Sequence, residues 1–411
     1  MPVTTALRPT VRMGAPIGFV EFVALVASMM AMVALGIDSM LPALPAIGDA
    51  LGVETENRRQ LVISAFTLGF GIGQLVHGPL SDRFGRRRTI LVSLAAYAIV
   101  NILCAAAMSF PLLLAARLAG GVAVASTRVS TTAMVRDCYD GRAMARVMSI
   151  AFMVFMIVPV VAPMFGSAVL LIGNWRLIFE TVAVAAAMLG TWFALRMPET
   201  LAVADRASLD GKRIVAGWRL AVSDRWSLGY TLATTAMMGA LYGYLTTIQQ
   251  IMADTFHRPR ELLVVFGVAA GTMAAANLAN AALVLRVGTR RISHGAVVGL
   301  IVVSVVHMAI VMRGAEPLWV FVLAQALTMG CFGLASANFS AMAMANMGRI
   351  AGTAASVQGF TSVTVGTLLG AAIGQAFDGT PRAMVAGFLV SGIVALGIIA
   401  ITERGRLFRP A

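Results

Sequence analysis

Long apolar runs divide this chain, and no other feature constrains its fold as strongly. A run of about 18 to 25 apolar residues is long enough to cross the hydrocarbon core of a bilayer as a helix. Of the 411 residues, 59% are hydrophobic and only 12% are charged, a composition that excludes an ordinary soluble protein. The sequence predicts an all-α polytopic membrane protein with twelve transmembrane helices, centred near Met30, Gly69, Ala98, Val122, Val158, Met188, Ala240, Ala274, Val303, Leu327, Val363 and Ile393.

The basic residues predict the orientation of these spans. Twelve spans return both termini to one side of the membrane, and the loops on that side hold 22 of the 31 Lys and Arg residues. The opposite side holds seven, and Arg117 and Arg128 fall inside a span. Because positive loops stay in the cytoplasm, both termini are expected there. The net charge of +13 is spread over short clusters without a long basic face, which argues against nucleic acid as a partner.

The longest polar interruption separates the spans into two sets of six. Residues 198–227 carry both charge signs and predict a cytoplasmic linker, with one amphipathic helix over about residues 212–222. Residues 1–197 are then an N-terminal six-helix half and residues 228–411 a C-terminal six-helix half. An internal repeat supports this division, because Arg83, Gly85, Arg87 and Arg88 recur 203 positions later as Arg286, Gly288, Arg290 and Arg291.

The most specific motif is the turn between the second and third spans. Residues 78–88 read GPLSDRFGRRR, which is too charged for hydrocarbon and therefore lies at a membrane face. Its pattern, Gly-x-Leu-x-Asp-Arg-x-Gly-Arg-Arg, resembles the loop between helices two and three of the major facilitator superfamily. The resemblance implies a secondary transporter with two pseudo-symmetric six-helix halves. It also implies a small-molecule substrate site between the halves, alternating access and no cofactor.

Further motifs narrow the resemblance, mainly in the first half of the chain. They are similar to the twelve-span drug:proton antiporters of the Bcr/CflA type, named for bicyclomycin and chloramphenicol resistance. That family implies proton-coupled efflux of small amphipathic compounds across the bacterial inner membrane by a protein that works as a monomer. The matching residues are Asp38 with Pro42 and Pro45 in the first helix, Arg117 and Val135-Arg136-Asp137 in the fourth, and the antiporter-type Pro159, Pro163 and Gly166 in the fifth.

Asp38 is the leading candidate for proton coupling. A carboxyl group held where water is scarce has its charged form disfavoured, so a proton and a cationic or polar cargo can compete for it. The alternative is that Asp38 lies near the outer interface and caps the turn at Pro42. Arg117 matches the helix-four arginine that the resemblance links to proton transfer and cargo contact. Glu21 and Glu180 are weaker candidates for a second coupling carboxyl, and Glu180 can instead pair with Arg176 one turn earlier.

The resemblance also implies a cytoplasmic gate. In the family, the aspartate of the turn faces a helix N-terminus, whose macrodipole favours negative charge. An arginine of the turn pairs with an acidic residue, and Asp137 is the candidate here. The alternative for the third arginine, Arg88, is that it only keeps the loop in the cytoplasm. The predicted gate residues are Gly78, Asp82, Arg83, Gly85, Arg86, Arg87 and Asp137.

Several polar side chains inside the spans are candidates for the substrate cavity. A charged side chain facing lipid at a helix centre costs roughly 2.5 to 3.5 kcal/mol, so Arg128 should face a cavity or extend to the membrane surface. Polar residues of the later helices either line the cavity or join helices through hydrogen bonds. The predicted cavity residues are Arg128, Tyr242, Tyr244, Gln249, Asn277, Asn338 and Gln358.

Other classes of function find little support. The chain has no His-Glu-x-x-His, Gly-x-Ser-x-Gly or Gly-x-x-x-x-Gly-Lys pattern, so neither an enzyme nor a nucleotide-driven pump is expected. Its three cysteines are isolated, and no metal site is predicted. A symporter or facilitator for a sugar or organic acid, sharing the same fold, stays open as an alternative. A membrane sensor would need a soluble output domain, and the longest loop has only about thirty residues.

Overall fold

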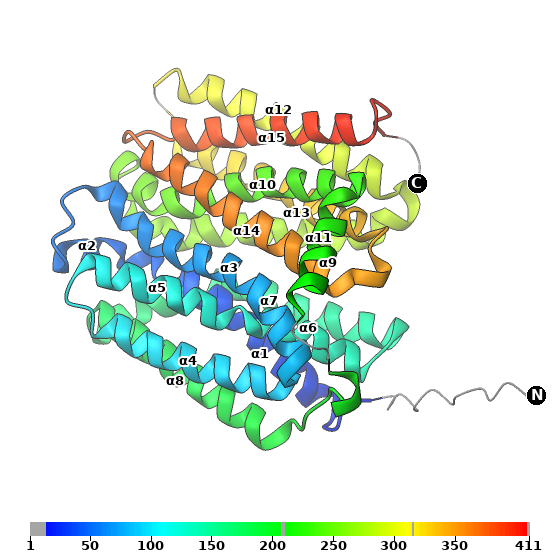
Figure 1. Ribbon diagram of the computed structural model, residues 1–411. Helices are drawn as coiled ribbons and strands as arrows, with labels where there is room; N and C mark the ends of the chain where they lie inside the picture. The colour runs from blue at the N-terminus through cyan, green and yellow to red at the C-terminus, as the bar shows by residue number, and fades with distance from the viewer. Residues whose placement is uncertain (1–13, 207–209, 315, 409–411) are drawn as a thin grey trace, which may run out of the picture.

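The structure is a computed structural model that describes residues 14–206, 210–314 and 316–408. It is almost entirely helical, and these residues contain no strand. Figure 1 shows long helices running side by side, with the first half of the chain packed against the second. The first half consists of α1 (Phe19–Asp38), α2 (Leu44–Ala50), α3 (Leu61–Phe84), α4 (Arg86–Ala105), α5 (Phe110–Val124), α6 (Ser126–Cys138), α7 (Gly141–Ile172) and α8 (Trp175–Arg196).

The second half repeats this arrangement after a short connecting helix. Its long helices alternate in direction, so α10 begins, and α15 ends, at the end of the bundle where α1 begins. We call this end the termini face and the other end the opposite face. The elements are the connecting helix α9 (Gly211–Ser223), then α10 (Arg225–Gln250), α11 (Leu262–Val287), α12 (Thr289–Val311), α13 (Leu318–Met344), α14 (Ala351–Gln375) and α15 (Arg382–Thr402).

The described helices meet the requirements of membrane spans. Ten helical stretches are at least 18 residues long and apolar enough to cross a bilayer. Two of them each join two helices, α1 with α2 over Phe19–Ala50 and α5 with α6 over Phe110–Cys138. The remaining long helices are α7, whose segment Ile157–Ile172 is a shorter apolar helix, and α10, which has 26 residues but carries many Thr, Tyr and Gln side chains. The prediction of an all-α polytopic fold is confirmed.

Prolines interrupt the first span just after Asp38. The α1 helix ends at Asp38, and a single 3-10 turn follows over Leu41–Ala43 with Pro42 near its start. Pro45 then occupies the first turn of α2. Because proline lacks a backbone N–H, the first turn of a helix is where it is tolerated. The sequence therefore places a break in the helix next to its buried carboxyl group.

The predicted repeat has the same backbone geometry in both halves. Gly85 ends α3 and begins α4 with φ +96° and ψ 157°. Gly288 ends α11 and begins α12 with φ +89° and ψ 153°. A residue with a Cβ atom rarely adopts such a φ, so both turns require glycine. The two turns lie at the termini face, where each connects two antiparallel spans.

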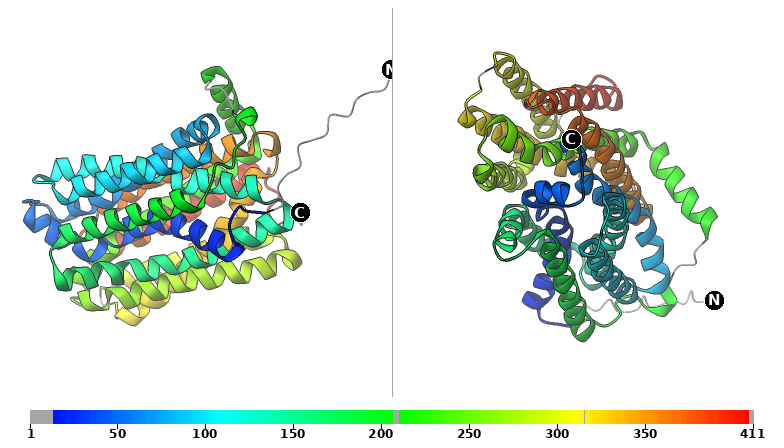
Figure 2. Two further views of the ribbon diagram at one scale, coloured as in Figure 1. Left: turned by 90° about the horizontal axis from the view of Figure 1, so that it is seen from below. Right: turned by 90° about the vertical axis from the view of Figure 1, so that its left-hand side faces the viewer.

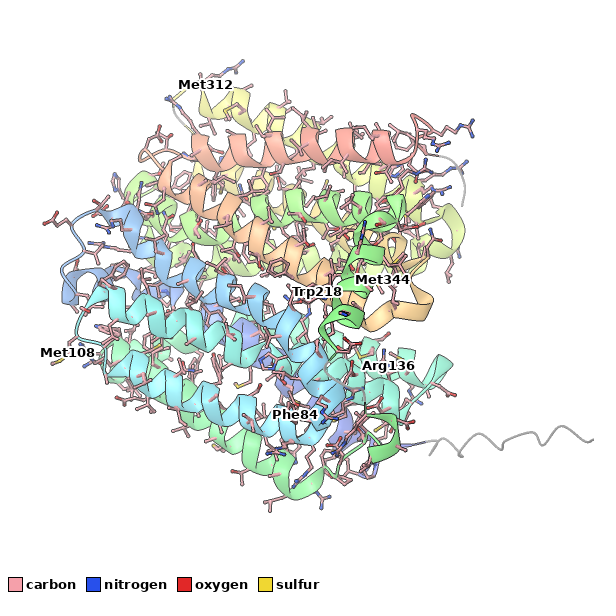
Figure 3. The ribbon with its side chains drawn as sticks, viewed as in Figure 1. Phe84, Met108, Arg136, Trp218, Met312 and Met344 are labelled. Atoms are coloured by element: carbon pink, nitrogen blue, oxygen red, sulfur yellow. The ribbon has the colours of Figure 1, made fainter. Side chains whose placement is uncertain are left out.

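The two halves meet along two pairs of helices, α3 with α14 and α7 with α11. Figure 2 shows this bundle from two further directions, with the long helices nearly parallel in the left view. The helix α9 runs across the spans, outside the bundle and near the termini face. Figure 3 shows side chains projecting from the helices into the spaces between them.

Candidate functional site

Asp38 lies well inside the first span. That span covers Phe19–Ala50, so Asp38 has 19 residues before it and 12 after it. Its residue surface is only 5% exposed. Among the described residues, no side chain forms a hydrogen bond or ion pair with its carboxyl group. Both observations argue against the alternative that Asp38 lies at the outer interface, because a capping carboxylate would contact backbone N–H groups there.

The antiporter-type segment of α7 packs against the turn that directly follows Asp38. Pro159 and Pro163 lie inside α7, and Pro163 is buried. Gly166 faces the junction between α1 and the following turn, where a Cβ atom would collide with the backbone carbonyl of Ser39 and come within 3.2 Å of Pro42 Cγ. Glycine at this position therefore permits α7 to approach the residue that follows Asp38.

Arg117 is fully buried in α5 and binds backbone rather than a carboxylate. Its Nη2 donates to the Gly36 carbonyl oxygen at 2.8 Å, and its Nε donates to the Val62 carbonyl oxygen at 3.1 Å. The guanidinium also lies 4.3 Å from the centre of the Phe66 ring, a favourable cation–π geometry. Arg117 therefore joins α1 to α3 two residues before Asp38. The described contacts contain no ion pair between these two predicted proton-coupling residues.

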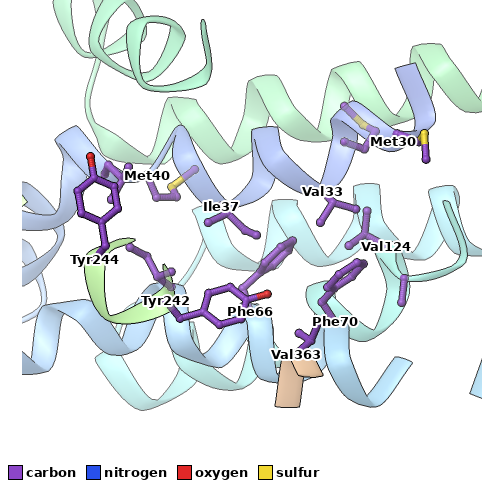
Figure 4. Close-up of a cluster of buried hydrophobic side chains, with 14 of the residues drawn as sticks. Met30, Val33, Ile37, Met40, Phe66, Phe70, Val124, Tyr242, Tyr244 and Val363 are labelled. Atoms are coloured by element: carbon purple, nitrogen blue, oxygen red, sulfur yellow. The ribbon is translucent and has the colours of Figure 1, made fainter. Parts of the chain in front are cut away.

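Tyr242 and Tyr244 of α10 approach the segment of α1 that ends at Asp38. Arg128 lies near the start of α6 and its residue surface is exposed. Figure 4 shows both tyrosines of α10 among the apolar side chains of α1 and α3. Two of the predicted cavity residues, Tyr242 and Tyr244 of the second half, thus lie beside the end of α1 in the first half.

The other predicted cavity residues lie elsewhere in the second half. Asn338 on α13 donates to the side-chain oxygen of Asn280 on α11 at 2.8 Å, so it joins two helices. Gln358 lies 3.5 Å from the Ser340 hydroxyl group. Gln249 is buried and Asn277 is partly buried. Within the described residues, none of these four side chains contacts Asp38 or Arg128 through a hydrogen bond.

The predicted pairing in the 78–88 turn is present. Arg86 Nε donates to Asp137 Oδ2 at 3.0 Å, and Arg86 Nη1 donates to Asp82 Oδ1 at 2.5 Å and to the Ser81 hydroxyl group at 3.2 Å. The Arg86 side chain is 5% exposed, so these partners compensate a largely buried charge. All of these residues belong to the first half.

The helix N-terminus in this turn binds Glu199, which the sequence did not single out. The Glu199 carboxylate accepts from the backbone N–H groups of Arg86 at 2.8 Å and Arg87 at 3.3 Å. These are the first residues of α4, where the helix dipole favours negative charge. The side chain of Arg87 donates in turn to the carbonyl oxygens of Met197 and Ala194. The start of α4 is thereby attached to the end of α8.

The resemblance implied that Asp82 faces a helix N-terminus, and among the described residues its carboxylate accepts no hydrogen bond from a backbone N–H group. Its side chain is half exposed and its partner in this structure is Arg86. Arg83 is exposed and forms no ion pair within the described residues. Gly78 does lie between the halves, where a Cβ atom would stand 3.0 Å from Ser356 Oγ of α14. The 78–88 turn therefore touches the second half through Gly78 and not through its charges.

Four amide side chains join the halves at the opposite face, and no sequence motif had pointed to them. We call Asn57, Gln60, Gln250 and Gln375 the amide bridge. Asn57 Nδ2 donates to the Phe377 and Gln375 carbonyl oxygens at 2.8 and 3.2 Å. Gln250 Nε2 donates to Asn57 Oδ1 at 2.9 Å and Gln375 Nε2 to the Asn57 carbonyl oxygen at 2.8 Å, while Gln60 bonds Gln250 directly.

The amide bridge indicates which face is closed. Its five hydrogen bonds connect residues of the first half with α10 and the end of α14. Within the described residues, no side-chain hydrogen bond or ion pair connects the two halves at the termini face. In the part of the chain that the structure describes, polar side-chain contacts therefore hold the halves together at the opposite face alone.

The two weaker acidic candidates have different surroundings. Glu21 accepts two hydrogen bonds from Arg196, at 2.6 and 2.8 Å, and one from Trp192 at 3.2 Å. Glu180 is exposed, and the expected pair with Arg176 is absent, because Arg176 Nη2 donates to the Ala107 carbonyl oxygen instead. That expectation was wrong, since Arg176 stacks on Trp175 and turns away from the next helical turn.

The second half has its own buried cluster at the termini face. Glu403 accepts from Arg290 Nε at 3.1 Å and from the Tyr230 hydroxyl group at 2.6 Å. Tyr230 also lies 3.2 Å from His294 Nε2. An acidic residue after the last helix of each half, Glu199 or Glu403, thus holds the repeated glycine turn. A groove of about 820 Å³ lies between the start of α13 and the start of α11, and none of the predicted cavity residues lines it.

Comparisons with known proteins agree with this architecture. The sequence profile of the Major Facilitator Superfamily matches residues 26–374. The uncharacterized MFS-type transporter YdgK of Bacillus subtilis (strain 168) is 27% identical over 346 residues, covering 83% of this chain and 85% of the relative. The bicyclomycin resistance protein homolog of Haemophilus influenzae is 25% identical over 368 residues, covering 89% and 91%.

A solved structure has the same fold. The crystal structure of a D-xylose-proton symporter superposes with a TM-score of 0.73, covers 96% of this chain and 100% of that protein, and is 11% identical in sequence. At this identity the likeness concerns the fold alone. Together with the profile match over most of the length, it establishes that the chain belongs to the Major Facilitator Superfamily and is a multi-pass membrane transporter, not an enzyme.

Proposed function

We propose that this transporter exports small amphipathic compounds in exchange for protons, with Asp38 as the proton-binding group. The observation that carries the proposal is the isolation of the Asp38 carboxyl group, which is 5% exposed and has no hydrogen-bond or ion-pair partner among the described residues. A buried carboxylate without a partner is costly, whereas a protonated carboxyl group is not. Binding and release of a proton therefore change the energy of this region strongly.

The surroundings of Asp38 suit an amphipathic cargo. In this proposal Arg128, Tyr242 and Tyr244 supply polar groups, and apolar side chains such as Ile37 and Phe66 lie beside the two tyrosines. A cargo that occupies this space would interact with the carboxylate and favour loss of its proton, which couples the two bindings. The relative named for bicyclomycin resistance supports a drug-like cargo, since it matches nearly the whole chain.

Arg117 acts as a positioning residue in this proposal. Its guanidinium binds the carbonyl oxygen of Gly36, two residues before Asp38, and so holds the end of α1 against α3. The close approach of α7 at Gly166 holds the other side of the same junction. A change in the charge of Asp38 therefore acts on a segment that three helices hold in place.

The polar contacts support an alternating-access cycle. We assign the termini face to the cytoplasm, on the basis of the Lys and Arg distribution. The amide bridge then closes the periplasmic side, and this conformation is one that faces inward or is occluded. The Gly78–Ser356 approach and the 78–88 turn would tighten when the protein faces outward, which is the role proposed for the gate residues Asp82 and Arg83. The cycle needs one copy of the chain, in the bacterial inner membrane.

Transport into proteoliposomes tests the proposal. The protein is reconstituted with an imposed pH gradient, and lumenal pH is followed while lipophilic cations, phenicols or sugars are added. We expect the drug-like compounds to trigger proton flux, and Asp38→Asn to abolish it. Glu180→Gln is the matched control, because Glu180 is an exposed carboxyl in a span and has no ion-pair partner among the described residues. Proton flux that survives in Asp38→Asn would refute the assignment of the coupling site.

The main alternative is a symporter or facilitator for a sugar or organic acid. The xylose symporter shares the fold, and the fold alone does not select a cargo. In the same assay, sugar-driven proton movement in the direction of the sugar would favour symport, and cargo flux without protons would favour a facilitator. Either result would reject the exporter proposal while leaving the transporter family unchanged.

A further inference from the structure

The connecting helix α9 lies across the membrane spans rather than along them. It covers Gly211–Ser223 and begins at Asp210, whose side chain accepts from the Lys212 backbone N–H at 3.0 Å. In Figures 1 and 2, α9 runs outside the bundle, nearly perpendicular to the long helices and close to the termini face. A helix at this place, beside the spans and across their direction, lies parallel to the membrane plane at the bilayer surface.

One side of α9 is attached to the bundle. Ala221 is buried against Ala354 and Val357 of α14, and Trp218 packs into the same cluster with Met344. Figure 3 shows Trp218 beside Met344 at the end of α13. Gly217 faces Thr353, whose Cγ2 would lie 3.0 Å from a Cβ atom at that position. These contacts fix the rotation of α9 about its own axis, so its remaining sides have defined directions.

The exposed sides of α9 combine apolar and basic side chains. Val215 and Val222 are 56% and 45% exposed, and their spacing of seven residues places them on the same side of the helix. Lys212 and Arg219 are also seven residues apart, exposed, and adjacent to the valines around the helix. Leu220, 53% exposed, lies on a different side, well away from Val215. An exposed apolar strip bordered by basic residues is typical of helices that bind a membrane surface.

We propose that α9 binds the anionic lipid surface of the cytoplasmic leaflet. The side carrying Val215 and Val222 faces the hydrocarbon boundary, and Lys212 and Arg219 bind lipid phosphate groups. Two exposed valines in water gain free energy when they enter the boundary between headgroups and acyl chains. Basic residues near an anionic leaflet gain attraction that salt weakens. The proposal concerns the partner of α9 and is independent of the cargo and of proton coupling.

Fluorescent labels at two positions of α9 test the direction that the helix faces. Cys104, Cys138 and Cys331 are replaced by alanine, and single cysteines are introduced as Val215→Cys or Leu220→Cys. These two positions are matched in exposure but lie on different sides. Each label is examined in vesicles with 30% anionic lipid, using brominated acyl chains as membrane quenchers and iodide as an aqueous quencher.

The two labels have opposite expected outcomes. We expect the label at 215 to be quenched by brominated lipid and protected from iodide, and the label at 220 to show the reverse. Equal iodide access at both positions would overturn the proposal, because α9 would then lie in water. Deeper burial of the label at 220 would overturn the assignment of the lipid-facing side.

Charge neutralisation tests the lipid headgroup contact. With the label at 215, Lys212→Gln and Arg219→Gln should each reduce the ratio of bilayer-bound to water-exposed α9 by about fivefold in anionic vesicles. Neither change should matter in vesicles of neutral lipid. Arg404→Gln is the control, since Arg404 is an exposed basic residue that follows α15 and lies outside α9. An equal ratio of bilayer-bound to water-exposed α9 in neutral and anionic vesicles would refute the binding of anionic headgroups. An equal fall in this ratio with Arg404→Gln would refute specific binding by α9.

Discussion

The amide bridge allows a quantitative prediction about the conformational equilibrium. In Asn57→Ala, three side-chain hydrogen bonds are lost, two donated by Asn57 and one accepted from Gln250. Each neutral hydrogen bond contributes about 0.5 to 1.5 kcal/mol net. Asn57 is partly exposed, so hydrogen bonds to water replace part of the lost energy. We expect the free-energy difference between the closed and open conformations of the opposite face to change by about 2 kcal/mol. The ratio of molecules closed at the opposite face to molecules open there should fall about 30-fold.

Paired spin labels provide the assay. One pair is placed across the opposite face, on the loops before α3 and after α14, and a second pair across the termini face. In the parent protein we expect a short distance across the opposite face. In Asn57→Ala that distribution should shift to longer distances, and the pair across the termini face should move closer together. The two changes must occur together, because alternating access couples the faces.

A matched control separates this effect from general damage. Asn174 also lies at the opposite face and accepts from the Arg176 backbone N–H at 2.9 Å, but that contact is within the first half. Asn174→Ala should lower stability slightly and leave both distance distributions unchanged. Unchanged distances in Asn57→Ala would refute the conclusion that the amide bridge closes the opposite face.

Two further predictions concern the repeated turns. Gly85→Ala and Gly288→Ala should each cost about 1 to 2 kcal/mol of stability, because both glycines have a positive φ. The loss should be larger at Gly85, where a Cβ atom would collide with Glu199. Equal losses in a thermal unfolding assay would contradict this contact. Glu199→Gln should destabilise the start of α4 by about 0.3 to 1 kcal/mol, because the carboxylate accepts from the first N–H groups of that helix. The measurement is amide hydrogen exchange at residues 86–88, which should become faster. An unchanged exchange rate would show that the carboxylate does not cap this helix.

The sequence predicted the features that depend on local pattern. Apolar runs of sufficient length have few alternatives to membrane helices, so the all-α fold follows from them. The repeat at Gly85 and Gly288 was recognisable because the same backbone turn needs glycine in both places. The pairing of Arg86 with Asp137 was expected from the resemblance, and the structure contains it.

The features that the sequence did not predict depend on distant contacts between ordinary polar residues. Glu199 lies 113 positions after the residue that it caps, and its only local signal is an acidic side chain just after a span. The amide bridge uses Asn and Gln, which occur in many loops, and residues up to 320 positions apart. Asn338 carried the same ambiguity, because an amide inside a span either lines a cavity or joins helices, and only tertiary packing decides between these.

The distribution of charge between the two faces bears on how a proton can drive the cycle. The strong contacts of the 78–88 turn lie within the first half, where Arg86 binds Asp82 and Asp137, so they do not oppose separation of the halves. Polar attachment between the halves rests on the amide bridge, whose five neutral bonds together contribute about 5 kcal/mol. A ligand must supply about 5.5 kcal/mol to shift a two-state equilibrium from 1:99 to 99:1. The two quantities are similar, so in the proposed cycle the exchange of a proton for cargo at Asp38 needs to supply only a few kcal/mol to open this bridge. Ion pairs buried between the halves would cost more to separate, because each separation would leave two uncompensated charges.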